Sequence, residues 1–206
     1  MSKAAYLLVA ALFSTLLLPA TAGAGEPRTH DGFLLRLSVG GGTGGSKIDD
    51  PTFGSVDLSG MPYDVNIAIG GMITPNFALH GTLFGWSMSD PDAEVFDPVL
   101  GSGSGTLNGD VTLGAFGGGV TYYLMPANVY LSGTLGFGSM EFDGDVSGET
   151  DSGLVLDLTV GKEWWVGNSW GLGLAGAYGY HSLGDPDVDS NWSGSTFTVR
   201  FSATLN

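Results

Sequence analysis

Two alternating segments joined by a short turn, within residues 153–183, constrain the fold of this chain most strongly. In the first segment every second residue is a leucine or valine, and in the second the larger apolar residues alternate with glycine and alanine. A repeat of two residues places side chains on opposite faces of a β-strand, whereas a helix repeats every 3.6 residues. Because only Gly167-Asn168-Ser169 separates the segments, we predict an antiparallel β-hairpin.

Aromatic residues lie at both ends of this hairpin and at one other predicted turn. Trp and Tyr are most stable at the level of the lipid headgroups, so they form bands at the two ends of a membrane-spanning strand. The residues expected at these interfaces are Tyr122, Tyr123, Trp164, Trp165, Trp170, Tyr178 and Tyr180. The hairpin is therefore expected to cross a membrane.

Residues 1–24 have the organisation of a signal peptide. Lys3 precedes an apolar run over residues 4–19, and Ala22-Gly23-Ala24 is a small-residue cleavage site. The apolar run is at the short end for a membrane-spanning helix, which argues against an uncleaved anchor. We expect a signal peptide over residues 1–24 and one domain over residues 25–206.

The charge content limits the kind of surface that this chain could present to water. Only 13% of its residues are charged, compared with about 25% in soluble domains, which is too few to cover the outside of a soluble β-domain. The net charge of −15 argues against nucleic acid as a partner, because phosphate binding needs clustered Lys and Arg. The absence of Cys excludes a disulfide scaffold.

Eight segments predicted as strands follow one another from Gly32 to Leu205. Most show a two-residue alternation, but Phe84 and Trp86 break it in the third segment, and the many glycines of residues 110–124 leave the facing of the fourth unassigned. Their connections alternate between long and short, and the long ones are residues 41–60, 89–109, 143–152 and 184–194. We expect these four connections to be polar, acidic loops on the extracellular side. The pattern predicts an all-β fold, an eight-stranded antiparallel up-and-down transmembrane β-barrel.

The chain resembles a known family in this arrangement of strands and connections and in two short segments. These are Gly-Phe-Leu-Leu-Arg-Leu at residues 32–37 and Gly-Val-Thr-Tyr-Tyr at residues 119–123. It is similar to the small eight-stranded outer-membrane barrels, which include OmpX, the OmpA transmembrane domain and OmpW-like proteins. The resemblance implies the outer membrane of a Gram-negative bacterium, with the lipid bilayer as a partner. Contact with lipopolysaccharide, through cations that bridge the acidic loops to its phosphates, is a further hypothesis. The chain departs from the family at its end, where Leu205-Asn206 replaces the usual terminal aromatic residue.

Five charged residues lie on the strand faces opposite the apolar rows: Arg36, Asp64, Asp157, Glu163 and Arg200. The first strand of a closed barrel is the neighbour of both the second and the eighth, so Arg36, Arg200 and Asp64 can meet inside. The lumen of an eight-stranded barrel is narrow, so buried charges there should pair. We predict a structural ion-pair network, and the alternative is a small OmpW-like pore for apolar or cationic solutes.

An enzyme that modifies lipid A is a further hypothesis, but the histidine positions argue against it. Acyl transfer or hydrolysis of this kind needs a Ser beside a His and an acid. His181 and Ser182 are adjacent in a predicted strand and point to opposite faces, and His30 and His80 lie in no common motif. We expect no catalytic site.

The glycine-rich and acidic loops contain no complete ligand motif. Residues 40–47 resemble a phosphate-binding loop, but Ser46 precedes Lys47 where Gly is required and no helix follows, so we expect a flexible loop. Asp143 and Asp145 begin a calcium-like loop whose twelfth position is Leu154. We predict no metal site and no cofactor, only weak association of divalent cations with the loops, and a monomer.

The leading functional hypothesis is a non-enzymatic barrel with a structural or surface-interaction role through its loops. A soluble lipocalin-like barrel remains the alternative fold, and it would need the apolar rows turned inward. Polar residues opposite the apolar row of the last segment allow that fold, but the small Gly and Ala residues in the fifth and seventh segments do not favour it.

Overall fold

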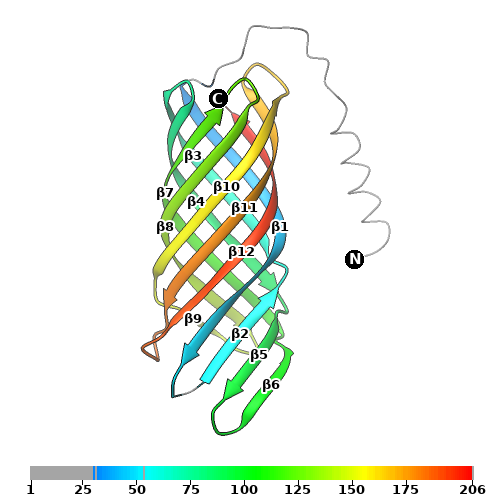
Figure 1. Cartoon of the computed structure of the whole chain (residues 1–206), viewed down its shortest axis with the longest axis vertical. Helices are drawn as coiled ribbons and strands as arrows, with labels where there is room; N and C mark the ends of the chain where they lie inside the picture. Colours follow the sequence, from blue (N-terminus) through cyan, green and yellow to red (C-terminus); the bar gives the residue numbers. More distant parts are fainter. Residues whose placement is uncertain (1–29, 31, 53, 206) are drawn as a thin grey trace, which may run out of the picture.

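The computed structural model describes residues 30, 32–52 and 54–205, which form a barrel of tilted strands (Figure 1). The predicted signal peptide and the terminal Asn206 lie outside the described residues. No helix in the described part of the chain is long and apolar enough to cross a membrane.

The described residues form twelve strands in one sheet, and the pairings between them are antiparallel. The strands are β1 (Phe33–Asp50), β2 (Gly54–Gly60), β3 (Tyr63–Thr74), β4 (Phe77–Ser89), β5 (Asp92–Asp97), β6 (Gly101–Thr106), β7 (Gly109–Leu124), β8 (Val129–Gly144), β9 (Gly148–Glu149), β10 (Gly153–Trp165), β11 (Trp170–Gly184) and β12 (Asn191–Leu205).

Eight of these strands, counted over the described residues, make the barrel wall in the order β1, β3, β4, β7, β8, β10, β11 and β12. The last strand returns to the first, with Leu37 of β1 opposite Ala203 of β12, and this pairing closes the barrel. Short turns connect β3 to β4, β7 to β8 and β10 to β11 at one end of the wall. This arrangement confirms the predicted all-β, eight-stranded antiparallel barrel.

Two of the segments predicted as loops are largely β-structure, and that prediction is wrong. β1 continues to Asp50 and pairs with β2, while residues 89–109 contain the hairpin of β5 and β6. We call residues 44–50 of β1, together with β2, β5 and β6, the projecting sheet, because it extends beyond the barrel wall (Figure 1). Ladder hydrogen bonds hold the Gly- and Ser-rich strands β2 and β6 although their side chains favour turns.

Gly42 shows why the glycine-rich stretch of β1 is ordered instead of forming the expected flexible loop. It faces inward and lies opposite Thr198 of β12. A Cβ atom at Gly42 would stand only 1.9 Å from the carbonyl oxygen of Phe197. The missing side chain therefore allows β1 and β12 to approach closely enough to close the barrel.

Near the end with the short turns, the wall is apolar outside and polar inside. We call this part the membrane half. The exposed outward row includes Leu37, Val39, Ile69, Leu79, Leu83, Phe116, Val120, Leu131, Leu135, Phe137, Leu158, Val160, Leu172, Phe197 and Val199. The buried inward residues include Arg36, Ser38, Asn66, His80, Thr82, Thr121, Thr134, Asp157, Thr159, Thr198, Arg200, Ser202 and Thr204. Only hydrocarbon is a suitable surrounding for such an outer surface.

Toward the other end of the wall, the outward face becomes polar and the inward face becomes apolar. In β8 the outward residues change from Phe137 to Ser139 and Glu141, while the inward residues change from Thr134 to Met140. We call this part the outer half. β4 and β7 change in the same way, so the break in alternation at Phe84 and Trp86 marks the level at which the wall leaves the hydrocarbon for water.

Because its apolar rows point outward through the membrane half, the chain is a transmembrane barrel and not a soluble lipocalin-like one. A closed wall satisfies every backbone group in lipid, and an even number of strands is the plan of bacterial outer-membrane barrels. The chain is therefore an outer-membrane β-barrel of a Gram-negative envelope.

Gly42→Val should lower the free energy of unfolding by about 1–3 kcal/mol, the usual effect of overpacking, because the added atoms would collide with the backbone of β12. Gly118→Val is the matched control, since a Cβ at Gly118 on β7 meets nothing within 4 Å. Urea titration in lipid vesicles, with a gel comparing boiled and unboiled protein, measures both. Equal stability of the two variants would contradict this role of Gly42.

Candidate functional site

Arg200 on β12 lies between two buried carboxylates in the membrane half. Its Nη1 atom donates to Asp157 Oδ1 at 3.0 Å, and its Nε and Nη2 atoms donate to the Asp64 carboxylate. Thr159 Oγ1 accepts a further hydrogen bond from Nη1 at 3.0 Å. One guanidinium therefore holds two carboxylates with a forked geometry that only Arg provides.

The position of Gly40 on β1 explains how Arg200 reaches Asp64. Gly40 lies opposite Arg200 on one side and opposite Asp64 on β3 on its other side. A Cβ atom at Gly40 would stand 2.9 Å from Cγ of Arg200. Because Gly40 has no side chain, the side chain of Arg200 can pass over β1 and reach Asp64 on β3.

Arg36 forms a second charged group closer to the short turns. Its Nε atom donates to Glu163 Oε1 at 3.3 Å, and its Nη2 atom donates to the hydroxyl of Tyr123 at 2.6 Å. The guanidinium carbon also lies 4.0 Å from the ring centroid of Tyr130, a cation–π contact. Thr204 completes the group by donating to Glu163 Oε1 at 2.7 Å.

The structure thus places all five predicted charged residues inside the barrel, but in two separate groups. Arg200 meets Asp64 as expected, whereas Arg36 pairs with Glu163 and not with Asp64. Register explains the separation, because Arg36 lies opposite Ala68, and Asp64 lies opposite Gly40. Four residues along a strand correspond to about 13 Å.

A small cavity of about 20 Å³ separates the Arg200 group from an apolar cluster in the outer half. Asp157 and Arg200 line it on one side, and Phe84 and Trp86 line it on the other. A space of this size holds about one water molecule.

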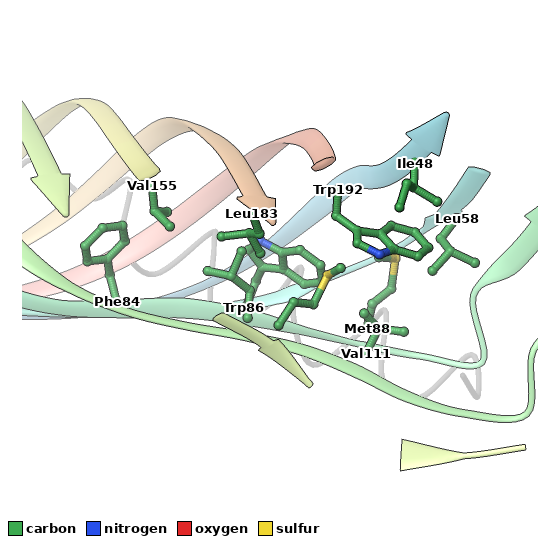
Figure 2. Packing of buried hydrophobic residues seen from close by; sticks show 11 residues of the cluster. Ile48, Leu58, Phe84, Trp86, Met88, Val111, Val155, Leu183 and Trp192 are labelled. Atoms are coloured by element: carbon green, nitrogen blue, oxygen red, sulfur yellow. The ribbon is translucent and has the colours of Figure 1, made fainter. Parts of the chain in front are cut away.

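The apolar cluster fills the interior of the outer half (Figure 2). Its buried members are Ile48, Leu58, Phe84, Trp86, Met88, Val111, Leu113, Met140, Val155, Leu183 and Trp192. They come from every strand of the wall except β3, with Leu58 added from β2. The two charged groups of the membrane half and this cluster of the outer half therefore follow one another along the lumen.

The three histidines lie in three different settings, and none forms a triad. His181 accepts or donates a hydrogen bond with Ser46 Oγ at 2.9 Å, a pairing across β1 and β11 that the sequence analysis missed. Both residues are buried among the apolar cluster, away from any lipid or solvent. His80 contacts the hydroxyls of Thr82 and Thr121.

His30 lies at the end of the barrel that carries the short turns. Its ring stacks on Tyr123 with centroids 3.6 Å apart, and its Nε2 atom lies 2.8 Å from Asn128 Oδ1. The residue is fully buried, so it contributes to the filling of the lumen at that end.

Most of the predicted interfacial aromatics face outward. Tyr122, Trp164, Trp170 and Tyr180 are exposed, and Tyr178 is half-buried against Phe197. The structure also exposes the ring of Tyr63 at the outer end of β3, although Tyr63 is not among the predicted interfacial residues.

The prediction that Tyr123 lies at the membrane interface is wrong, because its side chain is 0% exposed and lies inside the lumen against Arg36. Consecutive strand residues point to opposite faces, so Tyr122 and Tyr123 could not both face lipid. Trp165 likewise differs from its exposed neighbour Trp164, since it is half-buried with its ring centroid 5.0 Å from that of His30.

Within the described residues, no group of three or more His, Asp or Glu side chains is arranged to hold a metal ion. Some acidic side chains of the outer half instead accept hydrogen bonds from other residues of the same chain. Asp185 Oδ2, for example, accepts a hydrogen bond from the indole of Trp192 at 2.9 Å, and Asp145 Oδ2 accepts one from Asn108 at 2.7 Å.

No protein-family model matches the sequence, and no curated protein sequence matches it. Solved structures with a similar fold include Neisserial surface protein A, with 12% identity, a TM-score of 0.49, and coverage of 84% of this chain and 96% of that one. Ail, the attachment invasion locus protein of Yersinia pestis, has 15% identity, a TM-score of 0.41, and coverage of 84% and 99%. OprG from Pseudomonas aeruginosa has 13% identity, a TM-score of 0.41, and coverage of 88% and 98%.

Arg200→Met should lower the free energy of unfolding by about 3–5 kcal/mol, because it leaves Asp64 and Asp157 buried without a counter-ion. The triple variant Arg200→Met, Asp64→Asn and Asp157→Asn should recover much of this loss. Lys47→Met is the surface control, and losing its exposed pair with Asp49 should change the stability by at most about 1 kcal/mol. Urea unfolding followed by Trp fluorescence tests all three, and an Arg200→Met variant as stable as Lys47→Met would refute the assigned role.

Proposed function

We propose that this protein is a non-enzymatic surface barrel whose membrane half anchors it in the outer membrane and whose outer half presents an acidic contact platform to extracellular polypeptides. The observation that carries the proposal is the projecting sheet, which extends the wall outward as ordered β-structure. A structural role in the envelope is compatible with the same architecture.

The filled lumen supports this function over a pore. A solute would have to pass the Arg200 group, a cavity of about 20 Å³ and the apolar cluster. Opening such a path would break buried ion pairs, whose separation is strongly unfavourable. A small channel for apolar or cationic solutes therefore requires a rearranged interior.

The placement of the histidines supports a non-enzymatic role. Among the described residues, His181 lies within hydrogen-bond reach of the Ser46 hydroxyl, and His80 lies within reach of the Thr82 and Thr121 hydroxyls. All of these residues are buried inside the barrel. A lipid substrate on the outside of the barrel would be separated from them by the wall.

The projecting sheet supports contact with other molecules because it is both rigid and exposed. It stands at the end of the wall opposite the short turns (Figure 1). Six acidic residues and one lysine lie in its four strands, so the platform carries a strong negative charge. Ordered strands lose less conformational freedom on binding than flexible loops do.

Reconstitution of the full chain in planar bilayers should give no discrete current steps, because the lumen is filled along its length. The control is the Asp157→Asn variant under the same voltage and salt. Discrete openings in the natural chain that change in size or frequency in Asp157→Asn would show that the lumen conducts, and would replace this proposal with the pore.

Shortening the projecting sheet should abolish surface binding without unfolding the barrel. Asp90 and Gly109 already hydrogen-bond to each other, with Asp90 N 2.7 Å from Gly109 O, so an Asn-Gly turn can replace residues 91–108. We expect non-adherent bacteria that display the full chain to bind to at least one of a panel of immobilised serum and matrix proteins. Bacteria displaying the shortened chain should lose that retention.

The matched control replaces residues 186–189, in the turn between β11 and β12, by the same Asn-Gly pair. Asp185 N lies 3.0 Å from Ser190 O, so this end can also be closed by a short turn. Both shortened proteins are first tested for folding on the boiled and unboiled gel. Equal retention of all three strains, or retention lost in both shortened proteins, would contradict a specific role of the projecting sheet.

A further inference from the structure

The edge of the projecting sheet is formed by β6, which has a neighbour on one side only. In the described part of the chain, β6 is the last strand in the sheet order and pairs with β5 alone. All six of its residues are exposed. An edge of this kind presents a row of backbone N–H and C=O groups that an added strand can pair with.

The devices that usually block a free edge are missing from β6. Its sequence, Gly-Ser-Gly-Ser-Gly-Thr, contains no Lys and no Pro. The register with β5 runs one-to-one from Asp92 opposite Thr106 to Asp97 opposite Gly101, without a bulge. A Cβ atom at Gly103 or Gly105 would meet nothing within 4 Å, so the face of β6 is uncovered at these positions. Proteins commonly place charge, proline or a bulge where strand addition must be prevented.

The face beside this edge is acidic. Lys47, Asp57, Glu94 and Ser104 lie opposite one another in four successive strands and form one transverse row. This row lines a groove of about 380 Å³, which also includes Phe96. Lys47 forms an ion pair with Asp49, with the two charged atoms 3.3 Å apart. The net charge of the groove is therefore negative and comes from Asp57 and Glu94.

The tip of the hairpin is already ordered. Asp97 Oδ1 accepts hydrogen bonds from the backbone N–H groups of Leu100 at 2.9 Å and Val99 at 2.7 Å. These bonds stabilise the carboxylate and hold the pKa of Asp97 below its usual value. Val99 and Leu100 are 89% and 87% exposed, which offers apolar contact at one end of the edge. A preformed edge needs little ordering on binding.

We propose that β6 accepts an extended, cationic segment of a partner polypeptide as an additional strand. This inference rests on the proposed function and names the partner class. A basic residue opposite Ser104 would lie in the row of Glu94, about two strand spacings or 10 Å away, across a small side chain. A second copy of this chain is a poor occupant, because two acidic sheets repel each other.

The test uses the full chain in lipid nanodiscs and two peptides with equal charge, four repeats of Arg-Val and four repeats of Arg-Pro. Proline removes backbone N–H groups and does not continue a ladder, so only the Arg-Val peptide can add as a strand. We expect Arg-Val to bind at least about tenfold more tightly by calorimetry, a difference of about 1.4 kcal/mol. Equal affinities would show attraction by charge alone and would overturn the proposal.

Two variants locate the site. Ser104→Lys puts a cation on the edge beside Glu94, and Ser59→Lys puts the same charge on the same face of β2, away from the edge. Ser104→Lys should weaken Arg-Val binding by about tenfold, because its lysine would face the arginines of the peptide in the neighbouring strand and like charges destabilise pairing. Ser59→Lys should weaken binding by much less. Equal effects of the two variants would also overturn the proposal.

The two proposals fail in different ways. Suppose that bacteria with the shortened sheet lose retention while the Arg-Val peptide shows no preference for the nanodisc-bound barrel. The platform would then stand and strand addition at β6 would be wrong. If retention is unaffected by the shortening, the platform itself is refuted, whatever the peptides do.

Discussion

The surroundings of the wall change along the strands, and the rest of the structure depends on this change. A strand residue that points outward meets hydrocarbon in the membrane half and water in the outer half. Burial of apolar groups and exclusion of unpaired charges from lipid are both strong effects, so each face must match its surroundings at every level. The exchange from Phe137 to Glu141 outside β8, and from Thr134 to Met140 inside it, meets this requirement.

The contents of the lumen follow from the same constraint. In the membrane half, the outside holds the apolar residues, and the inside must be filled by polar groups that satisfy one another. Arg200 with its two carboxylates and Arg36 with Glu163 do so. In the outer half, water covers the outside, and the interior can be an ordinary apolar core centred on Trp86 and Met88. The membrane half therefore has a polar interior and an apolar outer surface, whereas the outer half has the apolar interior and polar outer surface of a soluble protein.

The outer half is therefore able to carry β-structure that the membrane half could not. Its apolar core supports Ile48 and Leu58, which hold the first strands of the projecting sheet in place. The free edge of β6 is tolerated because it faces water, whereas an open edge in lipid would leave its backbone groups without partners. The acidic charge of the sheet opposes pairing between copies of the chain.

The two-residue alternation and the alternating connection lengths determined the strand number, the closed barrel and the lipid-facing rows. They also placed Arg36, Asp64, Asp157, Glu163 and Arg200 inside, because a strand has only two faces. The phase change at Phe84 and Trp86 was visible in the sequence, as was the impossibility of a shared face for Tyr122 and Tyr123. Only the tertiary structure decided which charges pair, because the register between strands places Asp64 beside Gly40 and not beside Arg36. It also decided that the Gly- and Ser-rich residues of β6 form a strand, since ladder hydrogen bonds to β5 supply the stability that their side chains lack.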